Sequence, residues 1–276
     1  MSRKPLDRRA LFSSAAAAAL LAATGVSAGP LPQRGGKLRL ALSGAARSDD
    51  WTRGDGLFMQ VARLGVVYEA LTEVAADGTL RGELAVAWNS STDSRIWTFD
   101  LRNGVTFHDG TSFTAYDVVH SLAALGDVRA LAQASVEVTL TDPDPDFPFK
   151  LSNATNIIRP AHDAQGGIGT GLYRVRRFAA GQQLLAERVA THWKDGQAGW
   201  FDEVELVSIP SSAVRAQAVA EYLVDGADIA DASVLTGLND IAVWDGIAVA
   251  RSVAMPMTLG RGVFDDLRAA QRWWGA

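Results

Sequence analysis

Alternating apolar and polar residues mark several segments of this chain as strands with one buried face. Every second residue is apolar over residues 38–42, 97–101 and 136–140, and a period of two is typical of such strands. Residues 57–71 instead repeat their apolar positions at helical spacing, and a further strand is expected over residues 201–209. Strands and helices therefore alternate along the chain, which predicts a mixed α/β fold.

A second helix is expected after the paired serines Ser211 and Ser212, either of which can cap its first turn. Its residues Val214, Ala218 and Tyr222 fall on one side at helical spacing. We therefore predict that these three residues form the apolar face of this helix.

Residues 97–119 give the most specific local prediction, which is strand, turn, strand, second turn and helix start. The pair Asn103-Gly104 can adopt positive φ, as a two-residue hairpin requires, and it separates two stretches with apolar residues on one face. Thr114 and Asp117 have the spacing of a capping box, which predicts a helix beginning there. The apolar positions are Trp97, Phe99, Leu101, Val105 and Phe107 in the strands, and Val118, Leu122 and Leu125 in the helix.

The N-terminal residues have the features of an export signal. Arg8 and Arg9 followed by apolar residues fit the twin-arginine pattern, residues 15–23 are weakly hydrophobic, and small residues lead up to Ala28. A single membrane anchor is the alternative, but the hydrophobic run is shorter than the roughly 20 residues that span a bilayer. We therefore predict a twin-arginine signal over residues 1–28, cleaved near its end, and a periplasmic protein that is not integral to the membrane.

Charge and cysteine content narrow the class of protein further. The expected signal carries a net charge of +3, so its removal takes the formal charge of the chain from −5 to −8. An acidic chain argues against nucleic acid as a partner, because its binders need a basic surface. The chain has no cysteine, so its core must be stable without disulfides in an oxidising compartment.

Residues 97–119 also resemble the block WTFxLRxGVxFHDGxxFTAxDVV of a known family, the extracellular solute-binding proteins (family 5) that serve peptide and nickel ABC transporters. The resemblance runs in order over residues 35–231. Its further motifs are Tyr68–Leu71 ("YExL"), Leu84–Trp88 ("LAxxW"), Ile157–Pro160 ("xIxP", expected as a strand), Gly169–Tyr173 ("GTGPY", with Leu172 in place of proline), Thr191–Trp193 ("NxxYW"), Phe201–Val204 ("FDEV") and Ala227–Ala230 ("GxxDIA").

This resemblance implies a periplasmic-binding-protein-like α/β fold of type II, the peptide-binder class. Residues 35–56 and 166–276 would form lobe I with a mixed sheet, and residues 57–165 a small inserted α+β subdomain. Family members are longer and have two lobes around a cleft, whereas only residues 232–276 follow the last motif here. We therefore expect the distal lobe to be largely deleted, with residues 255–263 returning to lobe I as a strand and a short final helix after them.

The resemblance implies non-covalent binding of a peptide, metal chelate or other small solute for an ABC permease, without a cofactor. The alternative is a degenerate scaffold that acts as an accessory interaction protein for another periplasmic protein, without transport. The candidate ligand-binding residues are Trp51, Phe58, Met59, Asn153 and Asn156, which match regions near the ligand in the family. An ordinary packing or surface role is the alternative for each of them.

Motifs for catalysis and metal binding are weak. The four histidines are scattered and have no cysteine partner, so His108 with Asp109 is interpreted as part of a turn and no metal site is predicted. Residues 142–146 alternate aspartate with proline but lack the glycine and glutamate of an EF-hand. The glycines of residues 166–171 lack the Lys-Ser/Thr of a P-loop, and neither GxSxG nor SxxK is present. We therefore predict that the chain is not an enzyme.

Overall fold

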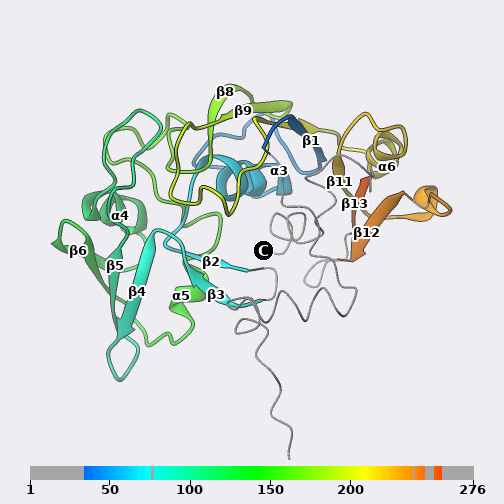
Figure 1. Cartoon of the computed structure of the whole chain (residues 1–276). Helices are drawn as coiled ribbons and strands as arrows, with labels where there is room; N and C mark the ends of the chain where they lie inside the picture. The colour runs from blue at the N-terminus through cyan, green and yellow to red at the C-terminus, as the bar shows by residue number, and fades with distance from the viewer. Residues whose placement is uncertain (1–33, 76–77, 239, 246–251, 257–276) are drawn as a thin grey trace, which may run out of the picture.

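The structure is a computed structural model, and it describes residues 34–75, 78–238, 240–245 and 252–256. These residues form two bodies, one around a seven-stranded sheet and one around a four-stranded sheet (Figure 1). The expected mixed α/β architecture is confirmed. The predicted signal over residues 1–28 lies outside the described residues.

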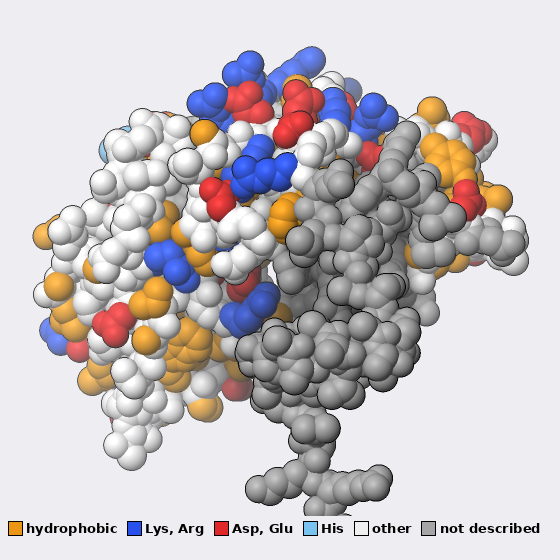
Figure 2. Space-filling model, viewed as in Figure 1, with side chains coloured by type: hydrophobic (Ala, Val, Ile, Leu, Met, Phe, Trp, Pro, Cys, Tyr) orange, Lys and Arg blue, Asp and Glu red, His pale blue; other side chains and the backbone are white. Residues whose placement is uncertain are grey.

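The larger sheet has the strand order β12-β13-β11-β1-β10-β9-β8. At its centre β1 runs parallel to both β10 and β11, while the remaining neighbours are antiparallel. Its strands are β1 (Lys37–Leu42), β8 (Tyr173–Ala179), β9 (Gln183–Arg188), β10 (Glu203–Ser208), β11 (Gly226–Ile229), β12 (Ile241–Asp245) and β13 (Ser252–Pro256). Figure 2 shows basic and acidic side chains interleaved over the β8–β9 hairpin, where Arg174 and Arg176 pair with Glu187.

Helices cover the two faces of β1. Leu40 and Leu42 pack with α3 (Leu57–Gln60) and with the π-helix η1 (Val61–Val67) that continues it. Ala41 points the other way and packs with α6 (Ser212–Ala220). The alternation of side chains along the strand thus buries both faces of the sheet centre.

The first predicted helix is shorter than its apolar spacing indicated. It ends at Val67 because Tyr68 has extended backbone angles, φ −116° and ψ 168°. Residues 57–67 pack in the core of the seven-stranded sheet. The domain boundaries expected from the sequence stay a prediction.

The predicted apolar face of α6 is wrong. Ser211 does cap the helix, because its side chain accepts a bond from the amide of Val214. However, Val214 is 53% exposed and Tyr222 is 48% exposed, while Arg215 and Val219 are buried. The helix ends at Ala220, and Tyr222 has φ 58°, so it lies beyond the last turn and cannot continue a helical stripe.

The smaller body is built on a sheet of order β4-β5-β7-β6. One face of this sheet packs with α4, and a separate β2–β3 ribbon lies before it in the chain. The elements are β2 (Thr72–Val74), β3 (Leu80–Gly82), β4 (Ala85–Ser90), β5 (Ile96–Leu101), α4 (Ala115–Leu122), β6 (Asp127–Ala132), β7 (Ser135–Thr139) and α5 (Phe147–Lys150).

The block at residues 97–119 folds largely as its pattern predicts. All five apolar strand positions are buried, and the Thr114–Asp117 capping box is present, with the amide of Thr114 2.8 Å from the Asp117 carboxylate. The predicted hairpin partner is wrong, however. Residues 105–107 pair with residues 111–113, through Phe107 N to Thr111 O at 2.8 Å, while β5 pairs with β4 and β7. The closed turn is therefore the one at Asp109-Gly110.

Two further expectations concern single segments. Residues 157–160, expected as a strand, belong to no strand, although the amide of Ile158 donates to the Glu69 carbonyl at 2.9 Å. The predicted returning strand is β13, which pairs antiparallel with β11. It begins at Ser252, three residues before the predicted start at residue 255. The predicted final helix lies outside the described residues.

The core of the smaller body rests on aromatic contacts of Phe99. Its ring is fully buried and lies 6.2 Å from that of Phe147 and 6.3 Å from that of Trp97. We expect Phe99→Ala to lower the free energy of unfolding by about 3–5 kcal/mol, measured by denaturant titration, because it leaves a cavity. Thr98→Ala, on the opposite face of β5, is the control with an expected change within about 0.5 kcal/mol. Equal changes for the two variants would contradict this assignment of the core face.

Candidate functional site

The carboxyl ends of three strands meet at one edge of the larger sheet. Because β1 runs parallel to β10 and β11, the segments that follow these strands all begin on the same edge. In open α/β sheets, ligands bind in the crevice outside the carboxyl ends of parallel strands. The carboxyl edge of β1, β10 and β11 is therefore the candidate binding site.

A buried ion pair fixes the backbone at this edge. The Asp228 carboxylate accepts bonds from the amide of Ser43 at 2.8 Å and from its hydroxyl at 2.7 Å. The Arg215 guanidinium pairs with the same carboxylate at 3.1 Å and also donates to the carbonyl of Ile209 at 2.6 Å. The three strand ends are thus joined through side chains, which holds the start of each following loop in place.

The loop after β1, residues 43–56, is held by its own polar contacts. The Asp49 carboxylate accepts from the amide of Ala46 at 2.7 Å, and the buried Arg63 guanidinium donates to the Gly54 carbonyl at 2.9 Å. A Cβ on Gly56 would lie 1.8 Å from the Gly44 carbonyl oxygen, so the ends of the loop touch through backbone. The loop is therefore a closed, preorganised element.

Three of the predicted ligand-binding residues, Trp51 in this loop and Phe58 and Met59 in α3, lie in one apolar cluster. Trp51 is 7% exposed, and its ring lies 4.7 Å from that of Phe178 and 5.8 Å from that of Tyr68. Phe58 and Met59 are fully buried in the same apolar cluster. In this structure all three pack, and ligand contact by them stays a prediction.

The other two predicted residues lie in the turns after α5. Asn153 is exposed and its side-chain oxygen accepts from the amide of Thr155 at 3.0 Å. The amide nitrogen of Asn156 donates to the Lys150 carbonyl at 2.7 Å. Both side chains therefore stabilise local turns, and their contact with ligand also stays a prediction.

A cluster of buried charges lies where the two bodies meet, and the sequence did not indicate it. The Lys194 ammonium, between β9 and β10, lies 3.2 Å from Glu69 and 3.4 Å from Glu73 and also bonds the Glu83 carboxylate. The other Glu83 oxygen accepts from the amide of Ala70 at 2.8 Å. We call Lys194 with Glu69, Glu73 and Glu83 the Lys194 cluster.

Aromatic residues beside Lys194 complete this junction. The Trp193 indole donates to Glu69 at 3.2 Å, and the Arg102 guanidinium lies 3.7 Å from the centroid of the Trp193 ring. The His192 ring lies with Nδ1 3.0 Å from the amide nitrogen of Lys194 and with Nε2 2.9 Å from the Thr170 carbonyl oxygen. Both ring nitrogens are therefore paired.

The charges of the Lys194 cluster perturb one another strongly. Burial together with the neighbouring Glu69 and Glu73 carboxylates raises the pKa of Glu83 to about 8, against the opposing effect of Lys194. Burial alone would raise the pKa of Glu69, but the Lys194 ammonium together with His192 and the Trp193 indole outweighs it and lowers that pKa to about 2. Burial opposes the charge on Lys194, yet its three carboxylate neighbours raise its pKa. One ammonium therefore lies among three carboxyl groups, of which Glu69 and Glu83 are buried.

Two family motifs lie at this cluster. Tyr68-Glu69 and Thr191–Trp193 were both recognised as family motifs, but nothing in their spacing predicts that they meet across 124 positions. Charged side chains are mostly exposed to solvent, so the sequence gave no indication that Lys194 is buried.

The glycine-rich and histidine motifs have structural roles. A Cβ on Gly169 would lie 1.9 Å from the Val67 carbonyl oxygen, so close backbone approach requires glycine there. His108 bonds the Gly171 carbonyl through Nε2 at 2.8 Å, and burial lowers the pKa of His108. Within the described residues no group of three or more His, Asp or Glu side chains could hold a metal ion.

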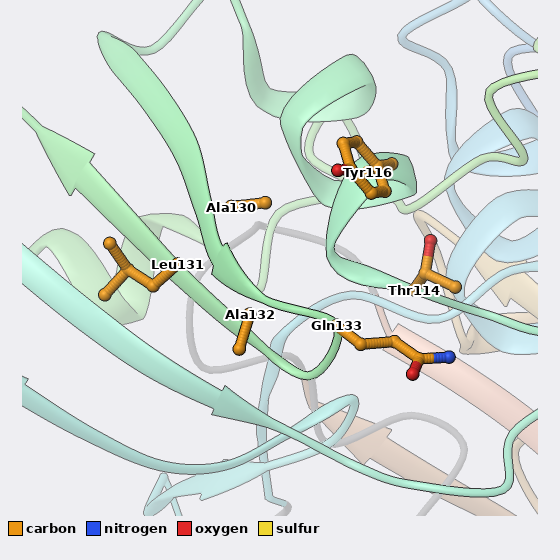
Figure 3. A pocket seen from close by; sticks show the side chains of 6 residues that line it. All are labelled: Thr114, Tyr116, Ala130, Leu131, Ala132 and Gln133. Atoms are coloured by element: carbon orange, nitrogen blue, oxygen red, sulfur yellow. The ribbon is translucent and has the colours of Figure 1, made fainter.

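A surface pocket of about 420 Å³ lies in the smaller body, away from the edge described above. Figure 3 shows Tyr116, on the first turn of α4, above the β6–β7 hairpin. The lining of the pocket is uncharged and consists of Thr114, Tyr116, Ala130, Leu131, Ala132 and Gln133. None of these residues was a predicted ligand contact.

In the part of the chain that the structure describes, no helix has the length and apolar character needed to cross a membrane.

The Lys194 cluster predicts a large effect of removing its cation. We expect Lys194→Met to lower the free energy of unfolding by about 3–5 kcal/mol, because the buried carboxylates lose their counter-ion. Lys150→Met is the control, since Lys150 pairs with Asp144 at the surface, and its expected cost is below about 1 kcal/mol. Denaturant titration of both variants measures the difference, and a cost for Lys194→Met no larger than the control's would refute the role of the cluster.

The raised pKa of Glu83 predicts a pH dependence. The pKa is about 8 in the folded chain against an ordinary value of 4.5, so folding favours the protonated carboxyl. That stabilising contribution is complete below pH 4.5 and is lost as the pH rises to about 8. The Tm of Glu83→Gln relative to wild type should therefore rise between about pH 5 and 8 and then level off. Glu221→Gln, at an exposed carboxylate, should show a constant difference, and a constant difference for Glu83→Gln as well would contradict the assignment.

Sequence and structure comparisons place the chain among known proteins. A sequence model described as "Bacterial extracellular solute-binding proteins, family 5 Middle" matches residues 79–269. The chain is 28% identical to the probable D,D-dipeptide-binding periplasmic protein DdpA of Escherichia coli strain K12, over 69% of this chain and 42% of that protein. It is 27% identical to the nickel-binding periplasmic protein of the same strain, over 58% of this chain and 35% of that protein.

A solved structure shares the fold. The periplasmic binding protein DppA from Helicobacter pylori, in complex with the peptide STSA, superposes with a TM-score of 0.64 at 22% identity, over 77% of this chain and 51% of that one. The chain thus spans a third to a half of the length of these relatives. Because the family model covers more than half of its residues, the chain belongs to the bacterial extracellular solute-binding proteins, family 5.

Proposed function

We propose that this protein is the periplasmic solute-binding component of an ABC transporter and captures a peptide, a nickel chelate or a related small solute without covalent chemistry. The observation that carries the proposal is the loop of residues 43–56, held closed at the carboxyl edge of β1, β10 and β11 in a chain of this family. A rigid backbone at such an edge suits ligand capture, because little ordering entropy is lost on binding.

The location of the protein belongs to the same proposal. A twin-arginine signal over residues 1–28 would export the chain in its folded state to the periplasm, with cleavage near Ala28. An ABC permease would then be its partner in the membrane. The relatives named as dipeptide- and nickel-binding periplasmic proteins support this assignment of compartment and ligand class.

The proposed ligand contacts centre on Trp51. Its small exposed surface would offer an aromatic face at the edge of the sheet, while Phe58 and Met59, which have no exposed surface, would form the floor beneath it. Asn153 and Asn156 would add amide groups to the site. Ile157, which directly follows Asn156, packs in the same apolar cluster as Trp51, Phe58 and Met59. Aromatic faces with a few polar groups are typical of small-molecule sites.

A second function is favoured by a different observation. The candidate contact residues near the sheet edge are mostly closed into the core. A scaffold of this kind could act as an accessory interaction protein for a periplasmic partner without transport. The experiment on the first function therefore has to separate ligand binding from protein binding.

Titration calorimetry with short peptides and with nickel bound to a small chelator tests the proposal. Saturable binding by the wild-type protein is the expected result, and Trp51→Ala should weaken it about tenfold, equivalent to about 1.4 kcal/mol. Trp88→Ala is the control, because Trp88 packs against Phe99 in the smaller body and should leave the affinity unchanged.

The possible outcomes separate the two functions. Absence of binding to every peptide and chelate, together with a stable partner protein in co-purification from the periplasm, would refute solute capture and support the accessory role. Binding that Trp51→Ala leaves unchanged would retain solute capture but remove Trp51 from the site.

A further inference from the structure

The outer strand of the smaller sheet is open to a second strand. In the strand order β4-β5-β7-β6, β6 pairs with β7 on one side only, and Figure 1 shows it at the outer margin of the molecule. The alternate amides and carbonyls of an edge strand point away from its sheet and can pair with another chain. The polar backbone of β6 is therefore available for this purpose.

The charges on β6 are complementary to those of a second β6. Arg129 lies opposite Glu137 of β7, with their charged atoms 2.5 Å apart, and Asp127 lies opposite Thr139. If two copies of β6 pair antiparallel with Val128 at the centre, Asp127 of each copy faces Arg129 of the other. Side chains directly opposite in an antiparallel pair lie on the same face, so acidic and basic groups alternate across the joint sheet, from Glu137 through Arg129 to Asp127 of the other copy.

The uncharged side chains beside β6 fit the same arrangement. Leu131 is 51% exposed and Tyr116 is 71% exposed, and they border the uncharged pocket of Figure 3. Leu131 follows directly on the paired stretch, so this uncharged border lies beside the end of the joint ladder.

The bulge in β6 sets the extent of the pairing. The register of β6 on β7 shifts between Ala130 and Ala132, which leaves Leu131 as the extra residue. A bulge interrupts the ladder, so pairing of two copies ends there and covers residues 126–130. Charges and bulges usually protect an edge strand, but the charges here attract their own copies across a two-fold axis instead of repelling them.

From these observations we infer that β6 is a self-association surface, on which a second copy of this chain pairs antiparallel about Val128. The two four-stranded sheets then become continuous across the two-fold axis. The surface lies on the smaller body and away from the edge of β1, β10 and β11, so the association does not depend on the identity of the solute.

Sedimentation velocity of the full chain over a range of concentrations tests the inference. The expected result is a reversible shift from monomer to dimer as the concentration rises. Leu131→Glu should weaken the dimer about tenfold, because it places a charge in the uncharged border. Leu223→Glu is the matched control, since Leu223 is 60% exposed on the larger body and should leave the association unchanged.

Charge exchange tests the register directly. Asp127→Arg places like charges opposite each other at both ends of the pairing and should weaken the dimer about tenfold. The double variant Asp127→Arg with Arg129→Asp restores opposite charges and should recover association. Because both positions are exposed, the thermal unfolding of each variant is measured to show that the fold is retained.

Three results would overturn the inference. A chain that stays monomeric at all concentrations would show that β6 does not bind its own copy. A dimer weakened by Leu223→Glu but not by Leu131→Glu would place the interface on the larger body. A double charge variant that fails to recover association while remaining folded would refute the antiparallel register about Val128.

Discussion

The buried ammonium of Lys194 is the interaction on which the arrangement of the two bodies depends. It comes from the segment between β9 and β10 of the larger sheet, whereas Glu69, Glu73 and Glu83 lie where the chain passes into the smaller body. Buried carboxylates are costly without a counter-ion, so any separation of the bodies would leave several charges unpaired at once. The junction is therefore fixed by electrostatics as well as by apolar contacts.

Close backbone contact reinforces this junction. Gly169 lies against the carbonyl of Val67, and the amide of His108, in the smaller body, donates to the Gly169 carbonyl at 2.9 Å. Together with Lys194, this segment connects the hairpin of the smaller body to the end of η1. Because η1 also carries Arg63, which bonds the loop of residues 43–56, the edge of the parallel strands is supported from the same place.

Local sequence pattern predicted most of the elements because local physics dominates them. The Thr114–Asp117 capping box is made by residues three positions apart, and the period-two pattern of residues 97–101 follows from the alternation of side chains along a strand. Where distant partners compete, the pattern failed. Residues 105–107 pair with the next stretch of chain because β5 is already paired on both sides, and α6 turns Arg215 inward because Asp228 lies there.

The sequence by itself determined the family and most strands and helices of its central blocks, since motif spacing and side-chain periodicity can be read from neighbouring residues. Only the tertiary structure showed that Trp51, Phe58 and Met59 share one core, that Lys194 is buried among three carboxylates, and that β6 is an edge strand. These features arise from residues far apart in the chain, and burial, charge pairing and strand neighbours exist only once the fold brings those residues together.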